Sequence, residues 1–310
     1  MGKRVVAIVG ALALVAAALF VRHALSDRGN GDGGPGAGTD GGSGGLPVVA
    51  CTPDLADICQ ALADDGKVTP AAETLDLDGA VDPPQEVDAW ITWDPAPGIA
   101  NLQDVNSEVW TGSTAIAQAE LAILVSPAAR EGLATACKSS LRWSCIAESA
   151  GDDLPTGTGS PETAEGLARI APLASSLHAP GDPTEVKGDL LTQVVEGPVD
   201  GQADAASMIE RITTRSGALA LVIGPKLVLD VAAASQQGQG QQLAVQQPSP
   251  PERIVAVLAV RSGRAAPDVL DAIRSPTVVE AWKGRGVSQG SAQLATEDRV
   301  GELYQIRERG

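Results

Sequence analysis

The chain has 310 residues, of which 44% are hydrophobic, and it carries a formal net charge of −17. An acidic surface repels phosphate backbones, so this charge excludes nucleic-acid binding as the main function. The hydrophobic residues are mostly Ala, Val, Leu and Ile, with one Phe and one Tyr, and such an aliphatic core favours helices packed on a mostly parallel sheet.

The N-terminus predicts a membrane anchor. Lys3 and Arg4 precede an apolar run over residues 5–21, close to the minimum of about 17 residues that a spanning helix needs. The run also fits the core of a signal peptide, but the residues that follow it make a poor cleavage site. We therefore expect an uncleaved transmembrane helix over residues 5–22, with residues 1–4 in the cytoplasm and the rest of the chain outside. A cleaved signal is the alternative.

Residues 23–45 predict a flexible linker. From residue 29 onward they are almost all Gly, with small polar residues and one Pro. Such a stretch cannot bury apolar surface, so it tethers the body that begins at residue 46.

Four cysteines fit an oxidising compartment. We expect Cys137 and Cys145 to be bonded, because the residues between them can form a turn between two helices. A bond between Cys51 and Cys59 is also considered, although a strand followed by a helix could separate their Cα atoms by more than about 7 Å. With no CxxC pattern and only two histidines, a zinc site is not expected.

The hydrophobic pattern of the body alternates between strands and helices, which is typical of an α/β fold. Continuous apolar runs predict strands at residues 46–50, 87–92, 119–125 and 254–260, with a short strand at 243–246. Helical spacing of apolar residues predicts helices from Pro53 to residue 62, from Pro127, at 141–148, from Pro161, at 205–212, at 269–273 and at 278–282. Residues from about 290 onward are expected to form a solvated tail or a loose helix.

Seven short motifs follow one another along residues 46–288. They occupy residues 48–53, 87–92, 120–127, 141–144, 160–166, 201–206 and 254–286, the last with Ser275 and Pro276 between two predicted helices. In type and order these motifs resemble those of the type 2 periplasmic solute-binding proteins, in particular the branch that includes molybdate- and sulfate-binding proteins.

The resemblance implies two α/β lobes joined by two crossing strands, with a ligand held between the lobes. Lobe I would comprise residues 46–115 and 242–290, lobe II residues 116–241, and residues 291–310 would form a C-terminal tail.

The resemblance also implies that ligand-binding side chains lie where strands end and helices or loops begin, because helix N-termini present unpaired N–H groups. At these positions, or just before the first crossing, lie Thr52, Thr92, Asp94, Ser113, Thr114, Ser160 and Thr163. Thr52, Asp94 and Ser160 can equally be ordinary helix N-caps.

Several residues depart from a site for a simple oxyanion. Pro53 removes one N–H donor, and the carboxylates of Asp54 and Asp94 would repel an anion. A neutral or amine-bearing ligand is therefore expected. Trp90 and Trp93 could offer a stacking face to a sugar, but core packing explains them more simply.

These observations predict a membrane-tethered, extracytoplasmic solute-binding protein that serves transport or sensing, without enzymatic activity, cofactor or metal. Its implied partners are a small-molecule ligand, the membrane, and an ABC-type permease or another cell-envelope protein. One alternative is a degenerate binding fold that serves as an envelope scaffold. A hydrolase is disfavoured, because His178 is the only histidine in the body and no GxSxG, SxxK or phosphate-loop motif occurs.

Overall fold

The computed structural model describes residues 45–103, 108–138, 140–150, 154–176, 178–179, 182–186, 205–214, 219–237 and 242–309. The chain divides into residues 1–45 and a body, residues 46–310. The expected anchor and linker, and residues 201–204 of one motif, lie outside the described residues. In the described part of the chain, no helix is long and apolar enough to span a bilayer.

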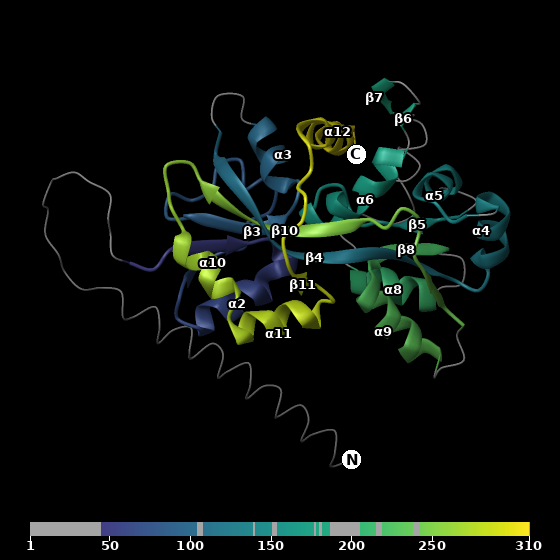
Figure 1. Cartoon of the computed structure of the whole chain (residues 1–310), viewed down its shortest axis with the longest axis horizontal. Coiled ribbons are helices and arrows are strands. Elements are labelled where there is room, and N and C mark those ends of the chain that lie inside the picture. Colours follow the sequence, from purple (N-terminus) through teal and green to yellow (C-terminus); the bar gives the residue numbers. More distant parts are fainter. Residues whose placement is uncertain are drawn as a thin grey trace, which may run out of the picture. The chain divides into compact units, whose positions relative to one another are not determined.

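Within the described residues, nine strands form one mixed sheet in the order β2-β1-β3-β10-β4-β8-β5, with β9 and β11 also paired to β4 (Figure 1). The strands are β1 (Val48–Cys51), β2 (Thr69–Pro70), β3 (Ala89–Trp93), β4 (Trp110–Val125), β5 (Thr156–Gly157), β8 (Leu221–Pro225), β9 (Ala244–Gln246), β10 (Arg253–Arg261) and β11 (Ser288–Gln289). A separate antiparallel pair consists of β6 (His178–Ala179) and β7 (Asp182–Val186).

Strand β4 belongs to both halves of this sheet. Its residues 110–120 pair with β10, and its residues 121–125 pair with β8 and β9. We call β1, β2, β3, β10 and β11 the first sheet half, and β5, β8 and β9 the second sheet half. Two chain segments, β4 and β9 followed by β10, therefore cross from one half to the other. The first crossing begins earlier than the predicted residue 119, because residues 110–118 alternate in burial instead of being continuously apolar.

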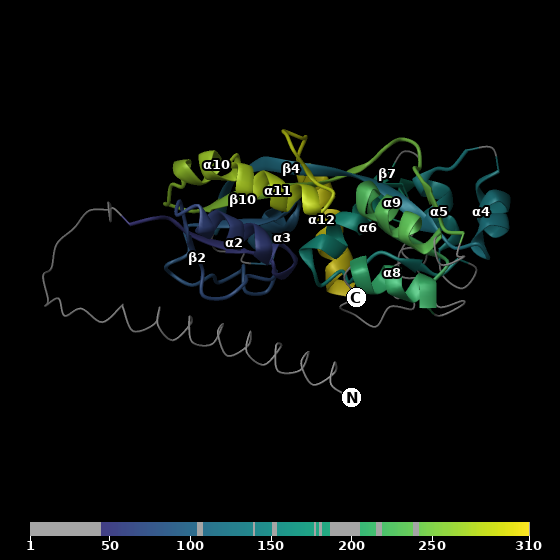
Figure 2. The same ribbon diagram turned by 90° about the horizontal axis from the view of Figure 1, so that it is seen from below.

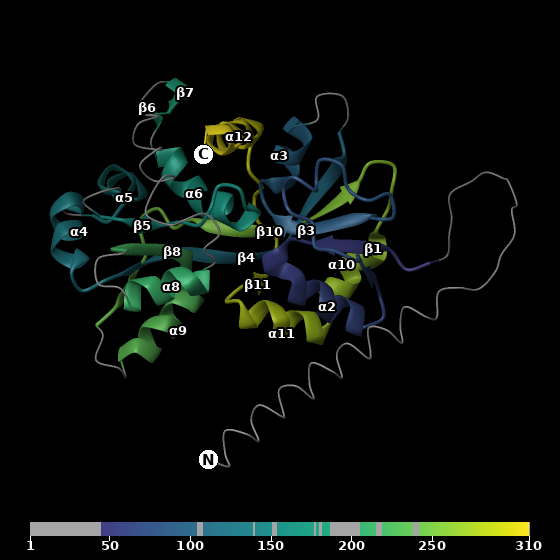
Figure 3. The same ribbon diagram turned by 180° about the vertical axis from the view of Figure 1, so that it is seen from behind.

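Helices cover both faces of the sheet. They are η1 (Pro53–Leu55), α2 (Ala56–Asp64), α3 (Ala96–Gln103), α4 (Ala129–Cys137), α5 (Trp143–Ser149), α6 (Ala164–Ser176), α8 (Ala205–Thr214), α9 (Lys226–Gln237), α10 (Pro267–Ile273), α11 (Pro276–Gly284) and α12 (Glu297–Arg309). Figures 1 and 3 show α2, α8, α9 and α11 on one face, and α3, α6 and α12 on the other.

Two tryptophans fix a loop to the first sheet half. The rings of Trp90 and Trp110 pack with their centroids 5.4 Å apart. Their indole N–H groups donate to the carbonyl oxygens of Leu75, at 3.2 Å, and Ala80, at 2.8 Å. Trp90 is fully buried and Trp93 is 2% exposed, so both belong to the core and neither offers a stacking face.

The C-terminal residues form a packed helix, whereas the sequence predicted a solvated tail or a loose helix. Val300, Leu303, Tyr304 and Arg307 share one face of α12 at helical spacing. Leu303 and Ile306 are buried, and α12 packs against both α3 and α6. All three views show α12 lying between these two helices (Figures 1–3).

Both disulfides are present, which confirms the expected Cys137–Cys145 bond and also the Cys51–Cys59 bond that the sequence left open. The Cα atoms are 5.3 Å apart for Cys137–Cys145 and 6.0 Å apart for Cys51–Cys59. The second distance stays within bonding range because the tight turn of η1 brings the start of α2 back toward the end of β1. This bond ties the strand that precedes Thr52 to the helix that follows it.

Replacing Cys51 and Cys59 together by Ala should lower the free energy of unfolding by about 2–3 kcal/mol, because the bond closes a short loop in the unfolded chain. Urea denaturation of wild type and variant, both recovered from an oxidising compartment, measures this change. Identical unfolding curves, or four titratable thiols in the wild type, would contradict the expected bonds.

Candidate functional site

A cavity of about 560 Å³ lies between the two sheet halves. It is within the range of roughly 300–1,000 Å³ that is usual for small-molecule sites. One wall consists of residues 52–54, which follow β1, and residues 76–78; the other consists of residues within 159–169, which follow β5. The cavity thus forms where strands of both halves end, the usual place for a ligand in an open α/β sheet.

Thr52 places an unpaired hydroxyl on the first wall. Its backbone N–H donates to the Ile91 carbonyl at 3.1 Å, and its carbonyl accepts from the Leu55 N–H at 2.9 Å. The side chain is 2% exposed, and its Oγ1 has no hydrogen-bond partner among the described residues. A buried polar atom in this state costs free energy that a ligand can restore.

Acidic side chains complete the first wall. Asp54 Oδ2 accepts a hydrogen bond from Trp93 Nε1 at 2.5 Å. Asp76 Oδ1 accepts from the Gly79 N–H at 2.8 Å, and Asp78 pairs with Arg307 of α12. Because the loop from Leu75 to Ala80 is held by Trp90 and Trp110, the carboxylates of Asp76 and Asp78 are carried on a fixed segment.

On the second wall, hydroxyl groups shape the turn that leads into α6. Ser160 Oγ accepts from the Glu162 N–H at 3.2 Å, and Thr163 Oγ1 donates to the Ser160 carbonyl at 3.0 Å. Thr163 Oγ1 also accepts from the Gly166 N–H at 3.1 Å. Thr163 is therefore the N-cap of α6, and the helix begins at Ala164, three residues after the predicted start at Pro161.

Arg169, which was not among the predicted site residues, also lines this wall. Its side chain is 1% exposed and pairs with Glu165 one helical turn earlier. Its Nε has no hydrogen-bond partner among the described residues. The sequence carried a signal for this residue, because it is a charged side chain within the apolar pattern of α6.

The charge of the cavity is negative. Of the residues that the structure describes, five carboxylates and one guanidinium, that of Arg169, line it, and the Arg307 guanidinium contacts its edge. The carboxylates are those of Asp54, Asp76, Asp78, Glu162 and Glu165. This arrangement concentrates cations and repels anions. Within the described part of the chain, no group of three or more His, Cys, Asp or Glu side chains could hold a metal ion.

The structure brings Thr52, Ser160 and Thr163 to this one cavity and places the other four predicted residues elsewhere. Thr92 is fully buried in β3. Ser113 and Thr114 lie on β4, half-buried and exposed respectively.

Asp94 lines a different cavity, of about 520 Å³, beside the segment that leads into α12. Its Oδ2 accepts a hydrogen bond from the Ala295 N–H at 2.6 Å, which fixes the start of α12 to the end of β3. Burial raises the pKa of Asp94 above its ordinary value, and the Ala295 N–H and Arg299 offset part of that rise.

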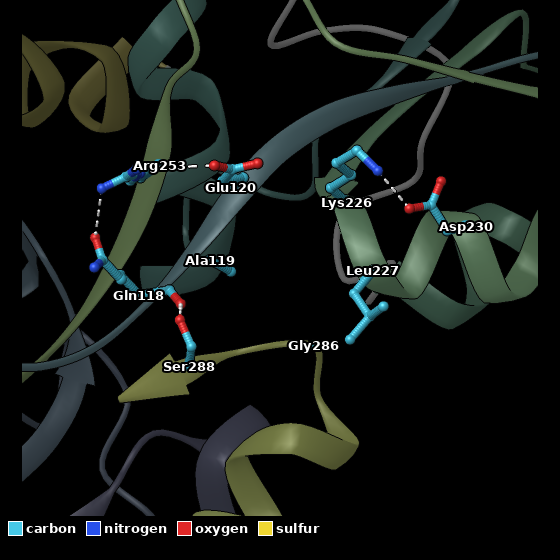
Figure 4. Close-up of a pocket in the computed structure, with 9 residues that line it drawn as sticks. All are labelled: Gln118, Ala119, Glu120, Lys226, Leu227, Asp230, Arg253, Gly286 and Ser288. Carbon is cyan, nitrogen blue, oxygen red and sulfur yellow. Dashed lines mark hydrogen bonds and ion pairs between the residues drawn. The ribbon is translucent and has the colours of Figure 1, made fainter. Parts of the chain in front are cut away.

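A third hollow, of about 310 Å³, lies between α9, β4 and the segment after α11 (Figure 4). Its charged side chains are paired with each other: Arg253 with Glu120 at 3.8 Å, and Lys226 with Asp230 at 2.6 Å. All four are about 40–50% exposed. It therefore offers an incoming solute fewer unmet interactions than the cavity at Thr52.

No family model matches the sequence, and no curated protein matches it. Solved structures, however, have a similar fold. The periplasmic binding protein AfuA from Actinobacillus pleuropneumoniae, with exogenous fructose-6-phosphate bound, matches with a TM-score of 0.51 and 13% identity, over 86% of this chain and 96% of that one. A periplasmic thiamin binding protein matches with a TM-score of 0.53 and 10% identity, over 85% and 95%. The body therefore has a mixed α/β fold that resembles two-lobed periplasmic binding proteins.

Gly166 should be essential to the second wall. A Cβ atom there would lie 1.9 Å from the Ser160 carbonyl oxygen, so Gly166→Ala must displace the 160–163 turn. We expect a loss of about 1–3 kcal/mol in unfolding free energy by chemical denaturation. Gly301→Ala is the matched control: its Cβ would meet nothing within 4 Å, so the better helix propensity of Ala should leave stability equal or higher by up to about 1 kcal/mol. Equal stability of the two variants would contradict this close packing.

Asp94 should make stability depend on pH. Because its folded pKa is raised, the ionised side chain penalises the folded state at neutral pH, and the penalty disappears as pH falls below the ordinary value of 3.8. Asn keeps an acceptor for the Ala295 N–H, so Asp94→Asn should be the more stable protein at pH 7. That advantage should shrink on acidification. Denaturant titrations between neutral and acidic pH measure it, and an advantage that grows toward acid would contradict the sign.

Proposed function

We propose that this protein is an extracytoplasmic solute-binding protein, tethered to a membrane by its N-terminus, that captures a small amine-bearing solute between its two sheet halves. One observation carries the proposal. Thr52 Oγ1 and Arg169 Nε, two buried polar atoms that find no hydrogen-bond partner in the described part of the chain, belong to residues on opposite walls of one acidic cavity.

The unpaired atoms favour a ligand that contacts both walls. Leaving a buried donor or acceptor unsatisfied costs about 1–3 kcal/mol, and a ligand that pairs with it recovers this free energy. Arg169 Nε can only donate, so it needs an acceptor such as a hydroxyl or carbonyl oxygen. Thr52 Oγ1 can donate or accept. A ligand that carries such an oxygen in addition to its amine can pair with both walls, whereas a simple diamine can pair only with the carboxylates and with Thr52.

The charges favour an amine over an oxyanion. An ammonium group is attracted by the five carboxylates, whereas sulfate or molybdate would be repelled by them. Pro53, which opens the first helix after β1, also withholds one backbone N–H from an anion. The oxyanions of the branch that the sequence resembles are therefore not the ligand we propose.

The tether and the fold support a role in transport or sensing. A binding protein held at the membrane keeps a captured solute close to a membrane partner. An ABC-type permease or another cell-envelope protein would be that partner, and the binding protein itself would carry out no chemistry.

A second candidate function is an envelope scaffold that keeps the fold without a ligand. One observation favours it: Asp78 and Glu162, which line the cavity, already contact the guanidinium of Arg307.

Thr52→Val tests the site, because it removes an unpaired hydroxyl and keeps the shape of the side chain. Isothermal titration with ethanolamine, putrescine and arginine should detect binding to wild type, and the loss of one hydrogen bond should weaken it about tenfold in the variant. Thr92→Val is the matched control: its Oγ1 is likewise buried and without a partner, but Thr92 does not line the cavity. Its affinity should equal that of the wild type.

Three outcomes would overturn the proposal. Binding of sulfate or molybdate with no binding of amines would show that the charge argument is wrong. Equal weakening by Thr52→Val and Thr92→Val would place the site elsewhere. No heat across the whole panel would favour the scaffold.

A further inference from the structure

Arg307 connects the two walls of the cavity. It lies near the end of α12, and its Nη2 pairs with Asp78 on the first wall. Its Nε lies 3.8 Å from Glu162 Oε2 on the second wall. Apart from this guanidinium, the walls at this edge are joined by no other ion pair within the described residues.

The position of Arg307 is set by the packing of its helix. Leu303 and Ile306 are buried between α3 and α6, and the Ala295 N–H fastens the start of the helix to Asp94. The Arg307 side chain is 6% exposed, whereas the side chains of Asp78 and Glu162 are 77% and 56% exposed. The buried guanidinium of Arg307 therefore contacts the carboxylates of Asp78 and Glu162, while both carboxylates stay accessible to solvent.

We propose that Arg307 is a clamp and an internal competitor: its own cation joins the two walls, and an incoming amine must displace it from Asp78 and Glu162. This inference rests on the proposed function, since it specifies how the same cavity admits its ligand. Two features support displacement. Among the residues that the structure describes, Arg307 Nε and Nη1 have no hydrogen-bond partner, and the contact to Glu162 is longer than a hydrogen bond. The guanidinium is thus incompletely satisfied where it rests.

The clamp has a consequence for affinity. When the binding-competent state is only partly populated, the apparent dissociation constant rises by the inverse of that fraction. Arg307 therefore lowers affinity for every amine and selects those that engage both carboxylates. Removing it should strengthen amine binding, whereas removing one of its carboxylate partners should weaken it.

The test uses Arg307→Gln, Glu162→Gln and the control Arg274→Gln in the full-length protein, with putrescine as the probe. Arg274 is exposed and pairs with Asp271 on α10, so its variant changes net charge without touching the cavity. By titration calorimetry, Arg307→Gln should bind putrescine about two- to fivefold more tightly, and Glu162→Gln should bind it more weakly by a similar factor. Arg274→Gln should match the wild type.

Hydrogen exchange without ligand tests the clamp separately. Both Arg307→Gln and Glu162→Gln break the same contact, so the amides of α12 should exchange about two- to fivefold faster in each. General destabilisation of the protein cannot explain faster exchange in both variants together with opposite changes in their putrescine affinity, because it would not raise the affinity of one variant and lower that of the other.

The outcomes separate the two claims. Two results would overturn the clamp and leave the proposed function standing. One is unchanged hydrogen exchange in both variants. The other is putrescine binding by Arg307→Gln that is no tighter than binding by the wild type, when the wild type binds. Putrescine binding by Arg307→Gln without binding by the wild type also supports the clamp, because Arg307 would then prevent binding completely. If neither protein binds putrescine or the other amines, the proposed function fails and the competition fails with it.

Discussion

The antiparallel pairing of β4 with β10 is the constraint on which the rest of the body depends. Residues 110–120 of β4 hold the first sheet half through β10, and residues 121–125 hold the second through β8 and β9. Strand β1 is joined to the β4–β10 pair through β3, and β5 is joined to it through β8. The ends of β1 and β5 therefore open onto one space. A shift in the β4–β10 register would separate Thr52 from Arg169. The cavity therefore depends first on the strand pairing of the sheet and only then on the loops that line it.

Within that frame, local packing fixes each wall. Indole hydrogen bonds from Trp90 and Trp110 hold the loop that carries Asp76 and Asp78. On the other wall, the absence of a side chain at Gly166 lets α6 approach the Ser160 carbonyl. The two unpaired polar atoms are therefore held in rigid surroundings, where they cannot relax toward solvent. Such preorganisation lowers the cost of binding a ligand that matches them.

The sequence predicted the α/β class and the apolar strands well, because residues 89–93 and 254–259 are continuous buried runs with one dominant signal. It failed where the signal was weak or long-range. The polar first part of β4 alternates irregularly, and the C-terminal helix has only a narrow apolar stripe among charged residues. Strand β8 was missed although residues 219–223 are apolar. For the site, local patterns identified Thr52, Ser160 and Thr163, but helix-opening logic also selected Asp94, which lies at another cavity. Arg307 was missed because its partners are set by tertiary packing, whereas Arg169 was missed although it is a charged side chain within the apolar pattern of α6.

Amine binding in the cavity between the sheet halves can be measured most directly at Trp93. Its indole N–H donates to Asp54 on the first wall, whereas the Trp143 indole donates to the Pro250 carbonyl, away from the cavity. In ¹⁵N NMR spectra of the full-length protein, titration with ethanolamine should shift the Trp93 indole resonance in a saturable way and leave that of Trp143 in place. A saturable shift of Trp143 with Trp93 unchanged would contradict amine binding in this cavity.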